Sequence, residues 1–423
     1  MLLRVAVLAR RFPLTRGVAC VAVLSLLGAG LGGALLTPGS QAATTPFLYV
    51  TNGDGSQSVT EYAQGATGNA NPVASLSGSA TNIKLPYGIA VDLAGNVFVA
   101  NRNSPSVTEY GPGASGNSAP IATIMGSATG LNTPQGIALD SFGNIFAVNS
   151  PASGTPSVTE YARGANSNIT PMATISGSAS DLTVDNSPYG IALDSAGDVF
   201  VSLSNNTVVE FAHGANGNVA PMAILAGSNT ILNQPNGLAI IAGTLYAANT
   251  NNTVTEYPLS SIVAGPDNIS PSATIAGSST GLNDPQGVAL DASGNIYVAN
   301  LASPTSVTEY SSNAKGNVAP VAIISGATTG LSSVNFLAVP PTTVSSPAVA
   351  PAPSPTTDAR GPAVGNATRS STASVSARPS NRSGTNFPSW AIALAAGGGL
   401  ILLLGAGALV NHRRRTGESS SRS

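Results

Sequence analysis

Short runs of alternating apolar and polar residues, each four to six residues long, recur throughout residues 43–340. Typical examples are GIALD (136–140), NIFAV (144–148), SVTEYA (157–162) and PIATI (120–124), and each is bounded by Gly, Asn or Pro. This pattern predicts short strands. Between the first two runs, the sequence D-x-x-G-N supplies the residue types that a tight hairpin requires. Helical periodicity is absent from this region, apart from a few residues near Ile262.

One pentapeptide marks a repeat in this pattern. SVTEY begins at Ser58, Ser106, Ser157 and Ser306, with the variants TVVEF at Thr207 and TVTEY at Thr253. Its glutamates are separated by 48, 51, 50, 46 and 53 residues. Four short strands repeated about every fifty residues predict the blades of a β-propeller, in which radial repetition protects the sheet edges.

The two ends of the repeat region predict how the ring closes. FLYVTN, from Phe47, matches the second strand of the repeat, whereas SVNFLAVPP, from Ser333, matches the first strand. The last strand should therefore complete the blade that the N-terminal strands begin. The expected fold is all-β, a six-bladed propeller of four-stranded blades with terminal strand closure.

The run P-x-G-I-A-x-D-x-x-G-N-x-Y-V-A-N, followed by SVTEY, resembles the NHL repeat of six-bladed propellers over about residues 46–340. The resemblance implies similarity to the extracellular sensor propellers of bacterial membrane serine/threonine kinases, to peptide-amidating lyases, and to protein- or RNA-binding modules. No kinase domain accompanies the repeats in this sequence. The fold therefore narrows the function without naming it.

Charge distribution further narrows the range of partners. Only 8 % of the 423 residues are charged, and residues 43–340 carry sixteen acidic against four basic residues, a net charge of −12. This balance argues against nucleic acid as a partner, because binding to phosphates requires a basic surface. The only cysteine, Cys20, precedes the repeats, which excludes disulfides and thiolate zinc sites from them.

The terminal segments predict export and anchoring. Residues 1–42 have four arginines, an apolar run and small residues before Ala42, as in a signal peptide, either cleaved or kept as an anchor. Residues 341–389 are rich in Pro, Ser and Thr and predict a disordered stalk. Residues 390–410 lack charge and would span about 31 Å as a helix, so we expect a single C-terminal transmembrane helix. The arginines in the basic tail, 411–423, place that end in the cytoplasm and the propeller outside the cell membrane.

The repeated glutamates invite a catalytic interpretation, but six copies in step with the chain favour a structural role. We expect each to form an inter-blade or blade-to-loop hydrogen bond, because neighbouring blades should cover both faces of the strand. The six are Glu61, Glu109, Glu160, Glu210, Glu256 and Glu309.

Metal chemistry has two weak candidates. The hairpin aspartates Asp92, Asp140, Asp194 and Asp291 fit either a calcium site or the turn itself, and the turn is favoured. His213 is the only histidine among the repeats and follows a third strand, toward the rim. We therefore expect no catalytic residues, no metal and no cofactor.

Residues that vary within the strict P-x-G frame are better candidates for a binding site. Their middle positions should lie at one mouth of the central channel, where amides and tyrosines suit a glycan, peptide or small polar ligand, although they could also simply fill loops. These residues are Tyr87, Gln135, Tyr189, Asn236 and Gln286, with Lys84, Arg102, Asp181, Asp185 and Asp284 on nearby loops.

These observations predict a cell-surface, membrane-anchored binding module, sensor-like or adhesin-like, for an extracellular glycan, peptide or protein. The alternative is an extracellular propeller lyase or hydrolase that uses the central channel. A third interpretation is a structural surface protein whose repeats pack against neighbouring molecules.

Overall fold

The computed structural model describes residues 47–341. The predicted signal peptide (1–42), most of the stalk, the predicted transmembrane helix (390–410) and the basic tail (411–423) lie outside the described residues. Among the helices of residues 47–341, none is both long enough and apolar enough to cross a membrane.

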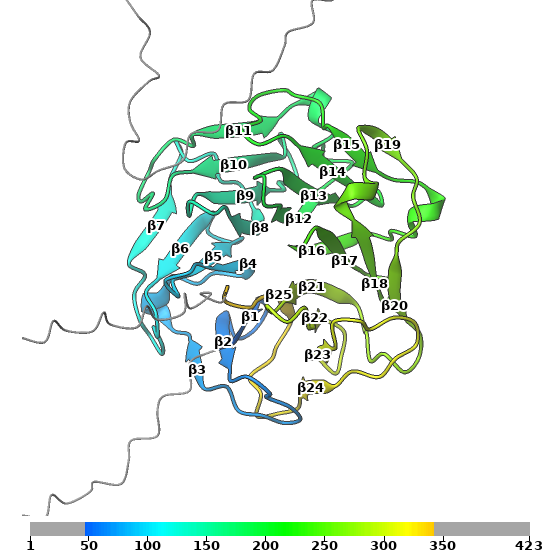
Figure 1. Cartoon of the computed structure of the whole chain (residues 1–423). Coiled ribbons are helices and arrows are strands. Elements are labelled where there is room, and N and C mark those ends of the chain that lie inside the picture. Colours follow the sequence, from blue (N-terminus) through cyan, green and yellow to red (C-terminus); the bar gives the residue numbers. More distant parts are fainter. Residues whose placement is uncertain (1–46, 342–423) are drawn as a thin grey trace, which may run out of the picture. The chain divides into compact units, whose positions relative to one another are not determined.

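The described residues form six β-sheets arranged radially around a central axis, as the sequence predicts (Figure 1). We number these blades from the first complete repeat. Blade 1 contains β4 (Pro86–Val91), β5 (Val97–Asn101), β6 (Ser106–Tyr110) and β7 (Ala122–Met125). Blade 2 contains β8 (Pro134–Leu139), β9 (Ile145–Asn149), β10 (Ser157–Tyr161) and β11 (Ala173–Ser176). Blade 3 contains β12 (Pro188–Leu193), β13 (Val199–Leu203), β14 (Thr207–Phe211), β15 (Ala223–Leu225) and β19 (Gly265–Asp267).

Blade 4 contains β16 (Pro235–Ile241), β17 (Thr244–Asn249), β18 (Thr253–Pro258) and β20 (Ala273–Ala276). Blade 5 contains β21 (Pro285–Leu290), β22 (Ile296–Asn300), β23 (Ser306–Tyr310) and β24 (Ala322–Ser325). Blade 6 contains β25 (Val334–Ala338), β1 (Leu48–Asn52), β2 (Ser58–Tyr62) and β3 (Ala74–Leu76). Four short 3₁₀ helices, η1 (Ser79–Thr81), η2 (Ser178–Ser180), η3 (Ser228–Thr230) and η4 (Leu259–Ser261), lie in the connections.

Blade 6 closes the ring, and its strands come from both ends of the domain, as predicted. Strand β25 pairs antiparallel with β1, with Val50 opposite Leu337 and Asn52 opposite Val334. In Figure 1 the yellow C-terminal strand lies beside the blue N-terminal strands. The ring is therefore fastened by a strand pair whose members are far apart in the sequence.

Blade 3 departs from the predicted four strands. The loop between β18 and β20 of blade 4 adds β19, which pairs parallel with the outer strand β15. At the other five junctions the corresponding loop makes a single parallel bridge, such as Leu76 to Gly116. Each outer strand is thus covered by a loop of the next blade, which limits the exposed sheet edge.

The repeated pentapeptide is held by its tyrosine and threonine. In blade 1, the Tyr110 hydroxyl donates to the carbonyl oxygen of Thr81, on the loop that enters the blade, at 2.5 Å. Thr108 Oγ1 accepts from Asn101 Nδ2 at 3.0 Å, and Asn101 Oδ1 accepts from the backbone N–H of Lys84, again on that loop. Equivalent bonds occur in blades 2, 4, 5 and 6. The blade-to-loop hydrogen bond predicted for the glutamate is therefore made by its neighbours.

An asparagine joins each pair of adjacent blades. Asn168, in the loop between β10 and β11, accepts a hydrogen bond at Oδ1 from the backbone N–H of Ala128, which follows blade 1, at 2.7 Å. Gly126 has a φ of 123° and faces this amide so closely that a Cβ would collide with it. The same latch occurs at the other five junctions, formed by Asn69, Asn117, Asn218, Asn268 and Asn317. These loop asparagines therefore connect adjacent blades at every junction of the ring.

Candidate functional site

A cavity of about 280 Å³ lies at one mouth of the central channel. Four of the five residues predicted from the P-x-G frame line it, together with the predicted Arg102 and two residues that the sequence analysis did not select. The lining residues are Tyr87, Arg102, Tyr189, Gln234, Asn236, Thr250 and Gln286. The structure therefore brings these side chains together, while their role in binding stays a prediction.

The local backbone explains why the P-x-G residues meet here. The inner strands begin at this mouth, and the register between Pro86 and Ile89 shifts where the frame lies. The residue before the inner strand has a positive φ in five blades, including 52° at Leu85 and 55° at Asp284. Because this left-handed conformation recurs around the ring, it belongs to the architecture and directs each following P-x-G segment in a similar way.

Arg102 and Tyr87 form one wall of the cavity. The Arg102 guanidinium carbon lies 4.9 Å from the centre of the Tyr87 ring, and Nη1 donates to the Tyr87 hydroxyl at 3.0 Å. This combination of stacking and hydrogen bonding fixes the guanidinium while leaving several of its N–H donors free of protein partners within residues 47–341. Arg102 follows β5, so a cation is held at the channel mouth by blade 1 alone.

A chain of amides forms the facing wall. Asn236 Nδ2 donates to Gln286 Oε1, and Gln286 Nε2 donates to Asp284 Oδ1 at 2.8 Å. Burial raises the pKa of Asp284, and the hydrogen bond from Gln286 partly offsets this effect. Asn236 is 8 % exposed, and its Oδ1 is buried without a hydrogen-bond partner among the described residues. An unpaired buried carbonyl of this kind favours a bound donor.

Other predicted residues of the mouth lie outside the cavity lining. Gln135 is 1 % exposed, and its Oε1 is also buried without a partner in the described part of the chain. Lys84 is exposed and contributes its backbone to the loop network. Asp181 and Asp185 lie on the loop that enters blade 3 and do not line the cavity.

Sequence reasoning missed Asn335, the sixth residue of the P-x-G position. It is buried at the start of β25, and its Nδ2 donates to the Pro86 carbonyl oxygen at 2.9 Å. Blade 6 replaces the proline of the frame by Val334 and the glycine by Phe336, which obscures the motif. Aligning SVNFLAV with P-x-G-I-A-L would have identified this position.

The opposite end of the channel has a different chemistry. A cavity of about 320 Å³ is lined there by the apolar ends of the inner strands, including Ile137, Leu139 and Leu290. An adjoining groove of about 550 Å³, which shares Val91 and Leu139 with this cavity, lies over the hairpins of blades 1 and 2, and Phe142 is 72 % exposed there. Of the two cavities at the ends of the channel, the first is therefore the one lined mainly by polar side chains.

The hairpin aspartates form turns. Asp92 Oδ1 accepts from the backbone N–H groups of Ala94 and Asn96, at 2.9 and 2.8 Å, and Oδ2 accepts from the Asn96 side chain. Asp140 and Asp291 repeat this arrangement in full. His213 lies against Gly197 of the neighbouring hairpin. Residues 47–341 contain no group of three or more His, Cys, Asp or Glu residues arranged to hold a metal ion.

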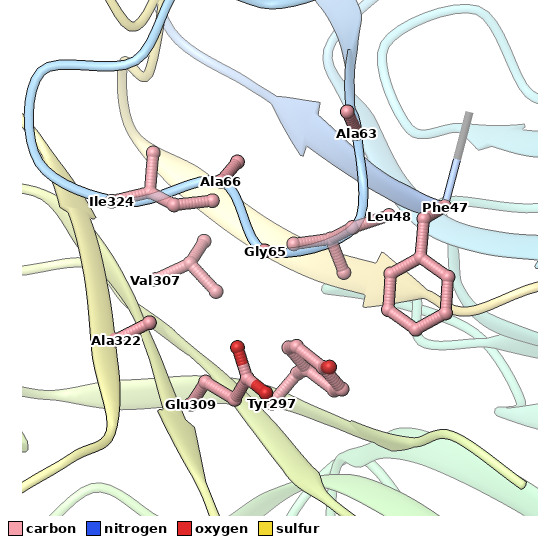
Figure 2. Close-up of a pocket in the computed structure, with 10 residues that line it drawn as sticks. All are labelled: Phe47, Leu48, Ala63, Gly65, Ala66, Tyr297, Val307, Glu309, Ala322 and Ile324. Carbon is pink, nitrogen blue, oxygen red and sulfur yellow. The ribbon is translucent and has the colours of Figure 1, made fainter. Parts of the chain in front are cut away.

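Each pentapeptide glutamate lies opposite an aromatic residue of the second strand, such as Tyr49 opposite Glu61 and Tyr297 opposite Glu309. Figure 2 shows Glu309 beside Tyr297 in a small pocket between blades 5 and 6. Phe47 packs edge-on against Tyr297 there, with 5.8 Å between the centres of the two rings. Burial and the Glu309 carboxylate raise the pKa of Tyr297. Glu61 is 1 % exposed, its Oε2 lacks a hydrogen-bond partner among the described residues, and burial raises its pKa to about 7.

The fold and the channel define the class of this protein, an all-β six-bladed propeller with a polar cavity at one mouth. No protein-family model matches the sequence. No curated protein matches it either.

Solved structures show likeness at the level of the fold. A protein of unknown function from Bacteroides caccae is 14 % identical with a TM-score of 0.50, and the match covers 70 % of this chain and 98 % of that chain. A chain of a nidogen/laminin complex is 16 % identical with a TM-score of 0.46, and covers 70 % of this chain and 98 % of its own. At this identity the first likeness supports the propeller architecture alone, and the NHL resemblance stays a prediction.

Proposed function

We propose that this protein is a cell-surface binding module whose propeller captures an extracellular glycan, peptide or small polar ligand at the channel mouth. The observation that carries the proposal is a cavity of about 280 Å³ whose lining includes Asn236, a residue whose buried Oδ1 lacks a protein partner in the described residues. A cavity near the lower end of the range for small-molecule sites, ~300–1,000 Å³, with a few converging polar groups, is typical of ligand binding.

Variation at the middle P-x-G position from blade to blade also supports ligand binding at the channel mouth. Positions that serve the architecture are nearly invariant around the ring, as the buried asparagine that ends the second strand is in five of six blades. The middle P-x-G residue is instead Tyr, Gln or Asn, although its backbone setting is similar in each blade. Because the fold does not need this variation, the variation is better explained by the shape and chemistry of a ligand.

We also propose that the propeller is exported and held at the cell membrane by the apolar segment 390–410, with the stalk 341–389 between them. The basic residues 413–415 support a cytoplasmic C-terminus. Protease treatment of intact cells tests this arrangement, with one epitope tag after Ala42 and another at the C-terminus. Loss of the first tag and retention of the second are expected, whereas protection of both would contradict surface display.

Binding is tested by screening purified full-length protein on glycan and peptide arrays, followed by titration of the best binder. The variant Tyr189→Ala removes a flat wall of the cavity, and Phe142→Ala removes an exposed aromatic residue far from the mouth. We expect the first variant to bind at least ~10-fold more weakly and the second to match wild type. Equal binding by both variants would remove the mouth as the binding site, and conversion of the bound molecule would favour the lyase or hydrolase alternative.

A further inference from the structure

We infer that the ligand of the channel mouth is a small molecule with a carboxylate group and a separate N–H or O–H donor. This inference rests on the proposed binding function and adds the chemical class of the ligand. The carboxylate would bind Arg102, and the donor would bind Asn236 on the facing wall.

Blade 1 is the one blade with a charged residue at the position of Arg102. The residue at its position in the other blades is neutral: Gly53, Ser150, Ser204, Thr250 and Leu301. Five blades form without a basic residue at this position, so the fold does not require a positive charge there. Arg102 is also one of only four basic residues between residues 43 and 340, in a region of net charge −12.

The surroundings of Arg102 leave its charge available. Within residues 47–341 its guanidinium has no carboxylate partner, and its one side-chain hydrogen bond goes to the Tyr87 hydroxyl. The Arg102 backbone N–H binds the Leu85 carbonyl, so Lys84 and Arg102 lie on two loops that are joined directly. A planar, immobilised guanidinium with free donors suits a carboxylate, which accepts two parallel hydrogen bonds.

The amide chain on the facing wall ends in a hydrogen-bond acceptor, so the ligand must supply the hydrogen-bond donor. Asp284 accepts from Gln286, and Gln286 in turn accepts from Asn236, so the carboxylate orients both amides. This orientation leaves the buried Asn236 Oδ1, an oxygen that can only accept, at the end of the chain without a partner in residues 47–341. A sugar hydroxyl or an ammonium group would satisfy it, so sugar acids and amino acids share the required chemistry.

Titration calorimetry on the full-length protein tests the inference with two matched pairs of compounds. D-glucuronate is compared with D-glucose, and L-alanine with L-alaninamide. We expect the carboxylate member of one pair to bind at least ~10-fold more tightly than its neutral partner, with affinity falling as salt is raised. The pair that responds distinguishes a hydroxyl donor from an ammonium donor.

Variants of Arg102 test whether this residue causes the preference for the carboxylate compound. Arg102→Gln should abolish the preference for the carboxylate member, Arg102→Lys should retain part of it, and Arg163→Gln, a change outside the mouth cavity, should retain all of it. Circular dichroism confirms that each variant is folded. Equal binding of both members, or no effect of Arg102→Gln, would overturn the ligand class while leaving the binding function intact. Failure of all four compounds to bind would also overturn the ligand class, and the array screen would still judge the binding function independently.

Discussion

Asn101 donates a hydrogen bond from Nδ2 to Oγ1 of Thr108 at 3.0 Å, and both side chains are fully buried. Blade 3 replaces the corresponding pair by Leu203 and Val209, which are buried in an apolar cluster. The tyrosine of the pentapeptide becomes Phe211 in the same blade. The buried polar network is therefore present or absent as a set, as expected when each member depends on the others for its hydrogen bonds.

This relationship predicts strong coupling between the two residues. Asn101→Leu and Thr108→Val should each destabilise the protein by about 1–3 kcal/mol, because each leaves a buried partner unsatisfied. The double variant should be destabilised by clearly less than the sum, since it removes both polar groups. Chemical denaturation of the four proteins measures the coupling free energy. Purely additive effects would show that the pair contributes no mutual stabilisation.

The inter-blade latch is predicted to contribute modestly at each junction. Asn168→Ala removes the acceptor of the Ala128 N–H and should lower the melting temperature by about 1–3 °C, which corresponds to one exposed hydrogen bond. Asn103→Ala alters an exposed asparagine elsewhere and serves as the control. An unchanged melting temperature for Asn168→Ala would mean that water replaces the latch without loss.

The raised pKa of Glu61 predicts that the free energy of unfolding falls as pH rises. Burial raises its folded-state pKa from 4.5 to about 7, so the folded state holds its proton more tightly than the unfolded chain. The contribution is complete below about pH 4.5 and is lost as pH rises through about 7. Burial also raises the pKa values of Glu109, Glu160, Glu210 and Glu256, which act in the same direction.

The variant Glu61→Gln tests this dependence. It should match wild type at pH 4 and exceed it at pH 8 by up to about 3 kcal/mol, because the amide has no charge to desolvate. Thermal unfolding at both pH values gives the comparison, with the exposed Asp54→Asn as a control in the same blade. If Glu61→Gln lowered stability equally at both pH values, the carboxylate would instead make a specific contact.

The sequence predicted the six blades and the closing strand because both depend on local periodicity and order. The repeat also located Tyr87, Tyr189, Asn236 and Gln286, since equivalent positions around a ring must meet at one mouth. The side chains that make the buried hydrogen bonds were harder to predict from the sequence. The period of fifty favours a structural role for the glutamate, which stays a prediction. It could not show that Tyr110 and Thr108 make the bonds while Glu61 Oε2 makes none in the described residues.

Features in which one blade differs from the others were missed for a related reason. Strand β19 forms because one loop is long enough to extend a single bridge into a three-residue pairing. Gln234 directly precedes β16 and Thr250 directly follows β17, at the positions of Asp284 and Arg102 in other blades, and neither was selected because neither carries a charge. Asn335 lies in the one inner strand whose flanking proline and glycine are replaced. Sequence periodicity describes what the blades share, whereas a binding site depends on how they differ.

The glycine of the P-x-G frame should couple ring stability to the mouth. A Cβ at Gly136 would lie 2.6 Å from the carbonyl oxygen of Tyr189, in the next blade, so Gly136→Ala must push the two inner strands apart. We expect a loss of about 2–4 kcal/mol in stability and weaker ligand binding, since Tyr189 lines the cavity.

Gly116→Ala provides the matched control for this prediction. Gly116 has a φ of 61°, and no atom lies within 4 Å of its added Cβ, so alanine there should cost only about 1 kcal/mol and leave binding unchanged. Thermal unfolding and ligand titration of both variants separate close blade packing from backbone strain. Wild-type affinity in a destabilised Gly136→Ala protein would show that the mouth is insulated from the packing of the inner strands, because Tyr189 would then keep its position while its backbone moved.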